Sequence, residues 1–527
     1  MPRTPLARIV QALFNNAFKA NTQQLPMDAV LEQRAERLAS RREFLGQSAK
    51  VGAVAASAAL MSQGSLIARA AVTPRVVVVG AGLAGLTCAY RLKQFGVNAT
   101  VYEAAQRLGG RCLSRRGFFN DGQVSERGGE LIDTGHRAVR MLAKELDLPL
   151  DDLLAAEPAG SEPFFNFNGQ PYTFAQASAD FADIFNTLAA DLKAAGYPTT
   201  FDSSTARGQE LDQLSIAEYI DLVVPGGHQS PLGQLLDVAY NIEFGAECTD
   251  QSALSLLYLL GYSSKQDFQI FGESDERFHV RGGNDLLVSG MASRLTGQIE
   301  LGKELVAVVK RPDGVYQLTF KSGANTSTAL ADHVVFALPF SILNYSVDYT
   351  QAGFSPLKIR AIQELGFGAN TKFQMQFSQR IWNALGNNGD TYSDRGYQVT
   401  WEATRAQAGA SGILVNFSGG NNALAYNRPV AQIAPGILSQ LEAVLPGVSA
   451  RYNGKATVDY WPGYRWTRGS YAYWKVGQYT TIAGAEGLAE GNAHFCGEHT
   501  SVDFQGYLNG AVDTGEIVAK EVLKAVR

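Results

Sequence analysis

At 527 residues the chain exceeds the roughly 250–300 residues at which one hydrophobic core stops growing, so we expect two or more domains. Its composition, with 46% hydrophobic, 10% aromatic and 18% charged residues, is globular and excludes a disordered or fibrous protein. The formal net charge of −5 argues against a general nucleic-acid-binding protein.

The first 70 residues differ in charge from the rest of the chain, with nine Lys and Arg against four Asp and Glu. Arg41-Arg42 precedes an Ala-, Val- and Gly-rich stretch over 49–61, and Ala68-Arg69-Ala70 supplies the small residues of a cleavage site. This pattern resembles a twin-arginine export signal, which implies the twin-arginine export machinery as a partner and a periplasmic or secreted mature protein. An ordinary helical extension over residues 1–70 is the alternative.

The following segment has the pattern of a dinucleotide-binding βαβ unit. A β-branched strand over 75–79 leads into a glycine-rich turn, and a helix over 86–95 is followed by a strand over 99–103. Glycines let the backbone approach a pyrophosphate at the helix N-terminus, and a carboxylate at the end of the second strand accepts ribose hydrogen bonds. This order predicts a dinucleotide site at Gly80, Gly82, Leu83, Ala84, Gly85 and Glu103.

Further motifs indicate which dinucleotide is bound. Arg107-Leu108-Gly109-Gly110-Arg111 and Glu126-Arg127-Gly128-Gly129-Glu130 follow the second strand, and Phe495-Cys496-Gly497-Glu498 precedes a final helix ending at Val526. With these motifs the chain, over about residues 75–527, resembles the FAD-dependent amine oxidases, which include monoamine, polyamine and L-amino-acid oxidases. The resemblance implies FAD-binding roles for Gly110, Arg111, Gly128, Gly129, Glu130, Val306, Trp461, Gly497, Glu498, Gly506 and Leu508.

The same resemblance implies an α/β fold with two interleaved domains. A discontinuous Rossmann-like FAD-binding domain (GR2-type) is expected over 74–135, 275–345 and 455–527. An α+β substrate domain of the amine oxidase type is expected over 136–274 and 346–454. Its first insert is helix-rich by periodicity, and its second shows strand-like alternation at 372–377 and 398–401.

Two tyrosines are candidates for the substrate site. By the resemblance, Tyr471 and Tyr507 match the pair that flanks the substrate amine in monoamine oxidases, and Trp461 lies beside the flavin. A desolvating aromatic pocket favours the neutral amine that hydride transfer requires. Core packing is the alternative role for both tyrosines. Ser470 stands where monoamine oxidases carry the flavin-linked cysteine, so we expect noncovalent FAD.

The chain departs from the family at a catalytic position. Many members carry a lysine, bonded through water to flavin N5, after the strand that ends in a proline motif. Here Asn344 or Tyr345 follows Leu338-Pro339 instead, and Lys372 is the nearest candidate for a substitute. The role of oxygen as electron acceptor is therefore open.

A second departure concerns recognition of a substrate carboxylate. Eukaryotic L-amino-acid oxidases place an arginine where this chain has Leu131. Arg137, Arg465 or Arg468 could still bind a carboxylate with two hydrogen bonds, although surface ion pairing is their ordinary role. Amine and amino-acid substrates thus both remain candidates.

The sequence therefore predicts oxidation of a primary amine or L-amino acid to an imine, which hydrolyses to an aldehyde or keto acid plus ammonia, with O2 reduced to H2O2. A flavin dehydrogenase or desaturase with another acceptor, and a non-catalytic flavoprotein, are the alternatives. No metal site and no nucleic-acid partner are expected, and a homodimer is left open. Widely spaced cysteines predict buried free thiols at Cys88, Cys112, Cys248 and Cys496.

Overall fold

The computed structural model of the protein describes residues 74–526, which belong to one compact unit. The predicted export signal, with Arg41-Arg42, lies outside the described residues. None of the helices described between residues 74 and 526 is long and apolar enough to cross a membrane. The predicted free thiols are confirmed, because all four cysteines are buried and none forms a disulfide.

A five-stranded parallel sheet forms the centre of one half of the protein, which we call the parallel-sheet half. Every neighbouring pair of its strands is parallel. The strands come from three distant segments of the sequence, so this half is discontinuous. Their spatial order is β22 (Ala493–Phe495), β13 (His333–Phe336), β1 (Val76–Val79), β2 (Ala99–Glu103) and β9 (Ile299–Leu301).

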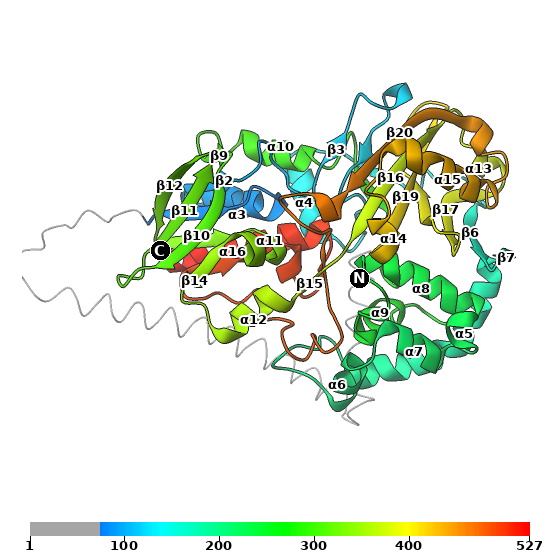
Figure 1. Cartoon of the computed structure of the whole chain (residues 1–527), viewed down its shortest axis with the longest axis horizontal. Helices are drawn as coiled ribbons and strands as arrows, with labels where there is room; N and C mark the ends of the chain where they lie inside the picture. Colours follow the sequence, from blue (N-terminus) through cyan, green and yellow to red (C-terminus); the bar gives the residue numbers. More distant parts are fainter. Residues whose placement is uncertain (1–73, 527) are drawn as a thin grey trace, which may run out of the picture. The chain divides into compact units, whose positions relative to one another are not determined.

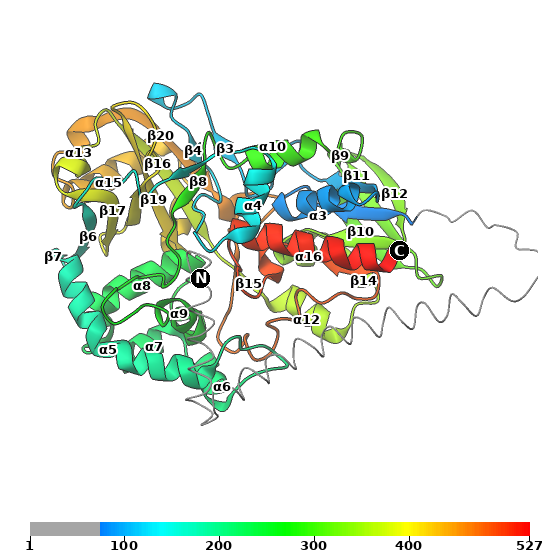
Figure 2. The same ribbon diagram turned by 180° about the vertical axis from the view of Figure 1, so that it is seen from behind.

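The four valines of β1 divide between the two faces of this sheet. Val76 and Val78 pack in a core with α3 (Leu83–Gln94), α4 (Arg137–Glu145), α10 (Leu286–Ser293) and α16 (Leu508–Val526). Val77 and Val79 pack with β10 (Glu304–Lys310), β11 (Tyr316–Ser322) and α11 (Phe340–Ser346). Burial on both faces explains the uninterrupted β-branched run. Figure 2 shows α3 beside α16 on the first face.

The predicted βαβ unit is present, with one difference at its helix. β2 spans 99–103 as predicted, whereas α3 begins at Leu83, three residues before the predicted start. Gly82 is the extended N-cap residue of α3, so the end of the glycine-rich turn is already helical. The turn therefore presents the helix N-terminus directly to whatever binds beside Gly82.

A seven-stranded mixed sheet forms the other half, which we call the mixed-sheet half. Its strands lie in the order β20 (Tyr452–Tyr460), β16 (Asn370–Phe377), β19 (Gly412–Gly419), β18 (Gln398–Glu402), β17 (Asn387–Ser393), β6 (Glu162–Phe167) and β7 (Gln170–Tyr172). One face carries α13 (Ile381–Ala384) and α15 (Val430–Glu442), and α14 (Gly420–Leu424) follows β19.

Five helices pack beside this sheet, and we call residues 174–274 the helical layer (Figure 1). Phe165, Phe167 and Val399 of the sheet enter its core. The helix-rich character predicted for the first insert is thus present. The helices are α5 (Phe174–Ala195), α6 (Ala206–Asp212), α7 (Ile216–Val223), α8 (Pro231–Phe244) and α9 (Ala253–Leu260).

Two predicted domain boundaries separate residues that belong to the same sheet. The boundary at 455 lies within β20, which pairs with β16 of the mixed sheet. The boundary at 345 precedes β14 (Asp348–Gln351), which pairs with β10 of the parallel-sheet half.

The remaining elements are β12 (Asn325–Ala331), α12 (Pro356–Glu364) and the short pairs β3 (Ser114–Arg115) with β4 (Ser125–Glu126), β5 (Leu150–Asp152) with β8 (Phe278–Val280), and β15 (Gly366–Phe367) with β21 (Ala472–Tyr473).

Candidate active site

A cavity is lined by residues from both halves of the protein. Its wall includes the turn after β1 and the end of β2, together with β16 and the C-terminal end of α8. Most of the predicted site residues meet here. Those that line the cavity are Gly80, Gly82, Leu83, Ala84, Glu103, Gly110, Arg111, Gly128, Gly129, Glu130, Lys372, Trp461, Tyr471, Gly497, Glu498, Gly506, Tyr507 and Leu508.

The glycines of the first turn have different spatial roles. Gly80 has a φ of +104°, and a Cβ there would lie 2.6 Å from the carbonyl oxygen of Ala337. A Cβ on Gly85 would lie 2.0 Å from the carbonyl oxygen of Gly80, so Gly85 lets α3 pack against the turn and does not line the cavity. A Cβ on Gly82 would have no atom within 4 Å. Its open side leaves room for a pyrophosphate.

Glu103 is oriented at the end of β2 by two backbone groups. Its carboxylate oxygens accept hydrogen bonds from the amides of Ala81 and Ala105, both at 2.8 Å. Burial raises the pKa of Glu103, and these two amides oppose the shift. Each oxygen keeps a further lone pair for a ribose hydroxyl. The predicted ribose contact stays a prediction that this geometry permits.

The second glycine doublet lets three predicted motifs approach one another. A Cβ on Gly128 would lie 1.8 Å from the carbonyl oxygen of Arg111, and one on Gly129 would lie 2.7 Å from Leu508 Cδ2. Arg111 donates to Glu498 Oε1 at 2.7 Å. The other oxygen of Glu498 accepts the amide of Gly506 at 2.8 Å. Motifs separated by almost 400 residues are therefore one structural unit.

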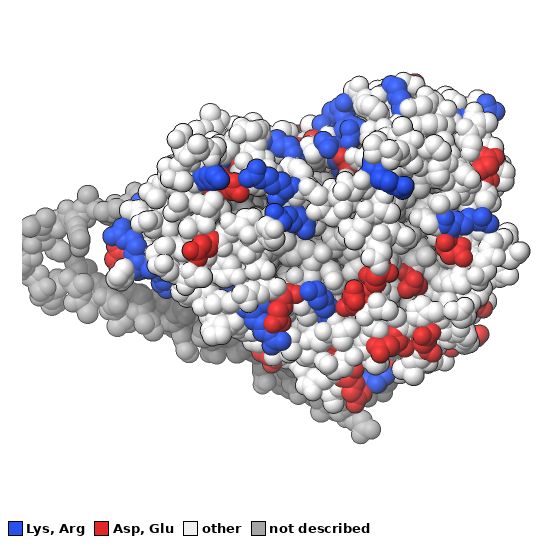
Figure 3. Space-filling view, viewed as in Figure 1, with Lys and Arg blue, Asp and Glu red and all other residues white. Residues whose placement is uncertain are grey.

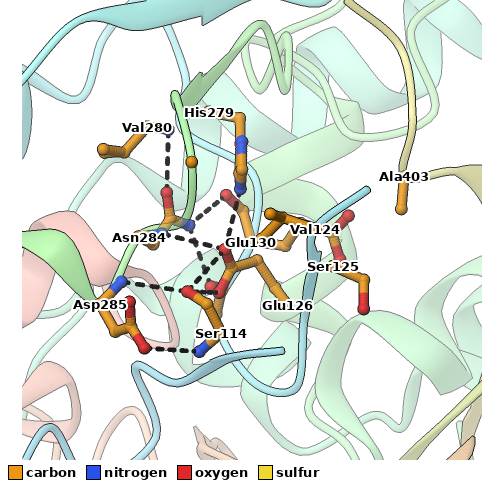
Figure 4. Close-up of polar contacts among 12 residues, drawn as sticks. Ser114, Val124, Ser125, Glu126, Glu130, His279, Val280, Asn284, Asp285 and Ala403 are labelled. Atoms are coloured by element: carbon orange, nitrogen blue, oxygen red, sulfur yellow. Dashed lines mark hydrogen bonds and ion pairs between the residues drawn. The ribbon is translucent and has the colours of Figure 1, made fainter. Parts of the chain in front are cut away.

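A buried polar network around Glu126, His279 and Asn284 supports the backbone of this doublet, and its contacts are drawn in Figure 4. Glu126 is fully buried, accepts the Asn284 amide at 2.9 Å and pairs with His279 Nε2 at 2.9 Å. Burial lowers the pKa of His279, but the hydrogen bond and charge of Glu126 outweigh it, and the net shift is upward. The Asn284 side chain donates to the carbonyl oxygens of Gly129 and Glu130 at 3.1 and 2.7 Å. The network thus fixes the backbone that faces the cavity.

Several polar groups of the cavity wall have no hydrogen-bond partner within the described chain. They are Thr467 Oγ1, Gln505 Nε2 and both ring nitrogens of His499. Burial, with the charges of Arg111 and Lys358, lowers the pKa of His499 well below its usual range, so its imidazole is neutral. Buried polar groups in proteins almost always have partners. A polar ligand such as a dinucleotide fits a cavity whose wall contains both these groups and the open side of Gly82.

The two predicted tyrosines lie in this wall and are held by the end of α8. Tyr507 Oη donates to Glu243 Oε1 at 2.8 Å, and Tyr471 Oη donates to the carbonyl oxygen of Ile242 at 3.0 Å. Burial raises the pKa of both phenols well above the usual value, and the charge of Glu243 adds to the shift. Both tyrosines are therefore neutral hydrogen-bond donors at neutral pH.

Two carboxylates of the cavity were not predicted from the sequence. Burial and, to a smaller extent, the charge of nearby Asp133 raise the pKa of Glu243 to about 7, against the Tyr507 hydrogen bond. Glu276 has a φ of +45°, a conformation rare for residues other than glycine, and its amide donates to Asp133 Oδ1 at 2.9 Å. Its carboxylate has no hydrogen bond or ion pair with the described residues. Neither residue belongs to a recognisable motif, so no sequence signal identified them.

Lys372 is buried in the cavity wall on β16. Its Nζ lies 2.5 Å from Glu130 Oε2, and Trp401 Nε1 donates to the other oxygen at 3.1 Å. The ammonium also lies 5.1 Å from the centre of the Trp401 ring. Glu130, predicted to contact the cofactor, is thus paired with Lys372 in the described structure.

Other predicted residues are not brought to the cavity. Asn344 is exposed on α11 and accepts a hydrogen bond from Tyr349 at 3.4 Å, and Val306 lies in β10 away from the lining. The three arginines considered for carboxylate binding are also outside the lining. Arg465 pairs with Glu304 at 2.9 Å, and Arg468 stacks on Tyr345. In residues 74–526, no group of three or more His, Cys, Asp or Glu is arranged to hold a metal ion.

Comparisons with known proteins agree with this architecture. The family model of flavin containing amine oxidoreductases matches residues 83–523. Polyamine oxidase 1 of Zea mays is 23% identical over 488 residues, covering 89% of this chain and 94% of that protein. L-amino acid dehydrogenase of Synechocystis sp. is 24% identical over 482 residues, covering 85% and 94%. The structure of wild-type putrescine oxidase bound to putrescine has a TM-score of 0.71 at 20% identity, covering 86% of this chain and 99% of that one. The predicted fold class is confirmed.

Proposed function

The chain belongs to the flavin containing amine oxidoreductase family, and from this premise we propose that it oxidises a primary amine that carries a second cationic group. The family is flavin-dependent, and FAD is the cofactor predicted from the motifs. The observation that carries the proposal is the pair of carboxylates, Glu243 and Glu276, in the cavity wall. The product imine would hydrolyse to an aldehyde and ammonia.

FAD, when bound, supplies the chemistry of accepting a hydride from the carbon next to the substrate nitrogen. The protein must therefore present that nitrogen as a neutral amine. An alkylammonium with a pKa near 10.4 costs about 4–5 kcal/mol to deprotonate at pH 7. Glu243, hydrogen-bonded to Tyr507, is the group at which the released proton can be held, because its pKa of about 7 lies near neutrality.

Glu276 has a different proposed role. Its carboxylate lines the cavity without an ion pair among the described residues. Desolvation raises its pKa, the charges of Glu243 and Asp133 add to the shift, and the charge of Arg405 opposes it. A distal ammonium of the substrate would relieve this repulsion and favour the ionised carboxylate. The two carboxylates would then bind the two ends of a diamine.

The two arginines of the cavity wall are bonded to the protein itself. Arg107 and Arg111 line the cavity, but both are already engaged. Arg107 donates to the Gly110 carbonyl and to Tyr464, and Arg111 donates to the Ser470 carbonyl and to Glu498. Both bonds of Arg111 come from Nη1, so Nε and Nη2 carry no hydrogen bond to the described residues, and the preference for an amine rests on the two carboxylates.

O2 is the electron acceptor that we propose. The Lys372 ammonium lies in the cavity wall, where a buried cation stabilises negative charge developing on oxygen. The close pairing of Lys372 with Glu130 favours the alternative, a dehydrogenase with another acceptor, because it neutralises that cation. Peroxide formed in equal amount to the oxidised amine would support O2, and turnover that needs an added dye would support the alternative.

The substrate proposal is tested by anaerobic stopped-flow measurement of flavin reduction. 1,4-Diaminobutane, butylamine and L-leucine form a series with two cationic groups, one cationic group, and one cationic group plus a carboxylate. We expect the diamine to have the largest second-order rate constant and L-leucine the smallest. A larger rate constant for L-leucine than for both amines would contradict the proposal.

We also propose that the mature protein acts outside the cytoplasm after twin-arginine export. The pattern around Arg41-Arg42 and Ala68-Arg69-Ala70 supports this localisation. Export of a folded chain would allow FAD to be loaded in the cytoplasm first.

A further inference from the structure

The negative charge of the protein is concentrated in the helical layer. Residues 174–274 contain 14 Asp and Glu against three Lys and Arg. Residues 71–173 and 275–527 together contain 32 Asp and Glu against 33 Lys and Arg. Outside the N-terminal 70 residues, the excess negative charge therefore comes from this one structural layer.

Most of these acidic side chains are exposed to solvent. Figure 3 shows them gathered over the helices of the layer, with basic side chains more frequent over the rest of that face. Of the few cations in the layer, Arg207 is already paired with Asp191 at 2.8 Å and Glu210 at 3.0 Å. The exposed acidic residues are Asp180, Asp183, Asp202, Glu210, Glu218, Asp221, Asp250, Asp267 and Glu273.

The layer is continuous with the acidic part of the cavity. Glu243 lies at the end of α8, a helix of the layer, and lines the cavity. Glu276 follows the end of the layer by two residues and also lines the cavity. Negative charge therefore extends from the exposed surface of the helical layer to Glu243 and Glu276, the carboxylates proposed to bind the substrate.

We propose that the helical layer attracts cationic substrates electrostatically and raises the rate at which they enter the cavity. A surface charge of one sign that leads into a cleft of low dielectric can raise association rates about 10- to 1,000-fold, with a steep dependence on ionic strength. At physiological salt the electrostatic field of a charge is screened over about 8 Å. A group of neighbouring charges therefore produces a stronger field at the protein surface than single charges that lie far apart. The layer acts through its summed field and is not a binding site. This inference rests on the proposed function.

The test compares two variants of the FAD-loaded enzyme with equal changes in net charge. The layer variant carries Asp183→Asn, Asp202→Asn, Asp250→Asn and Asp267→Asn. The control variant carries Glu300→Gln, Asp313→Asn, Asp348→Asn and Glu364→Gln, which are exposed residues of the parallel-sheet half. All eight changes are nearly isosteric, and none touches the cavity lining.

kcat and kcat/KM for 1,4-diaminobutane are measured from low to high ionic strength. We expect the layer variant to lose about three- to tenfold in kcat/KM at low ionic strength, with kcat unchanged and the difference lost at high salt. The control variant should stay close to wild type. Butylamine, a monocation, should show a smaller effect. Equal behaviour of the two variants with diaminobutane would overturn the inference.

A second readout requires no turnover and separates this inference from the proposed function. Of the five tryptophans, Trp401, Trp461 and Trp466 line the cavity and none lies in the layer. Quenching of tryptophan fluorescence by Cs⁺ relative to I⁻ should fall in the layer variant and not in the control. Failure of every amine to reduce the flavin would refute the proposed function, and the quenching ratio would still decide the steering.

Discussion

The hydrogen bond between Tyr507 and Glu243 predicts a specific change in pH dependence. The phenol donates to the carboxylate at 2.8 Å, and this bond holds the pKa of Glu243 down against burial, which raises it to about 7. In Tyr507→Phe the bond is lost, the ionised carboxylate is less stable, and the pKa must rise. A hydrogen bond to a charged group contributes about 1.5–3 kcal/mol, which corresponds to a shift of about one to two pH units.

The assay is kcat/KM for flavin reduction between pH 5.5 and 9.5, because this ratio reports ionisations of the free enzyme. We expect activity to fall below a midpoint near 7 in the wild type, where Glu243 becomes protonated. The midpoint should move upward in Tyr507→Phe and disappear in Glu243→Gln. Tyr471→Phe is the matched control, because its hydroxyl donates to a backbone carbonyl of α8.

An acid limb with the same midpoint in Tyr507→Phe, or one that persists in Glu243→Gln, would refute the assignment of the proton to Glu243. Melting temperatures of the same preparations should be measured in parallel. A lower melting temperature with an unchanged midpoint would indicate that the tyrosine only packs the core.

Four further outcomes are expected. Acid precipitation should release all the flavin into the supernatant, and yellow colour left in the pellet would contradict noncovalent FAD. Glu103→Ala should weaken FAD binding by about 1.5–3 kcal/mol in titrations of the apoprotein, and an unchanged dissociation constant would remove this residue from the site. Lys372→Met should destabilise the fold by about 3–5 kcal/mol by leaving Glu130 buried without its partner, and adding Glu130→Gln should restore much of the loss in chemical unfolding. Replacing Arg41-Arg42 with two lysines should leave the precursor inside the cell, whereas export as in wild type would argue against the twin-arginine route.

The sequence alone determined the nucleotide-binding part of this protein, because its signals are local. The valine run of β1, the glycine-rich turn and Glu103 lie within about 30 residues, and each has a direct steric or hydrogen-bonding reason. The turn therefore appears in the structure almost where the pattern placed it. The motifs at 107–111, 126–130 and 495–498 are instead recognised by their resemblance to the amine oxidases, and the contacts between them join segments that are distant in sequence.

Only the tertiary structure decided the composition of the substrate end of the cavity. Glu243, Glu276 and Lys372 come from a helix end, a strained loop residue and a strand, and packing brings them to one cavity from segments up to 130 residues apart. Asn344 was placed by counting from a proline motif, but the turn of α11 exposes it to solvent. The alternation of residues along a strand indicates which side chains share a face. It does not indicate which other strands lie beside that strand in the sheet. For that reason the position of Lys372 depends on the pairing of β16 with β19 and β20, a non-local choice made by the whole mixed sheet.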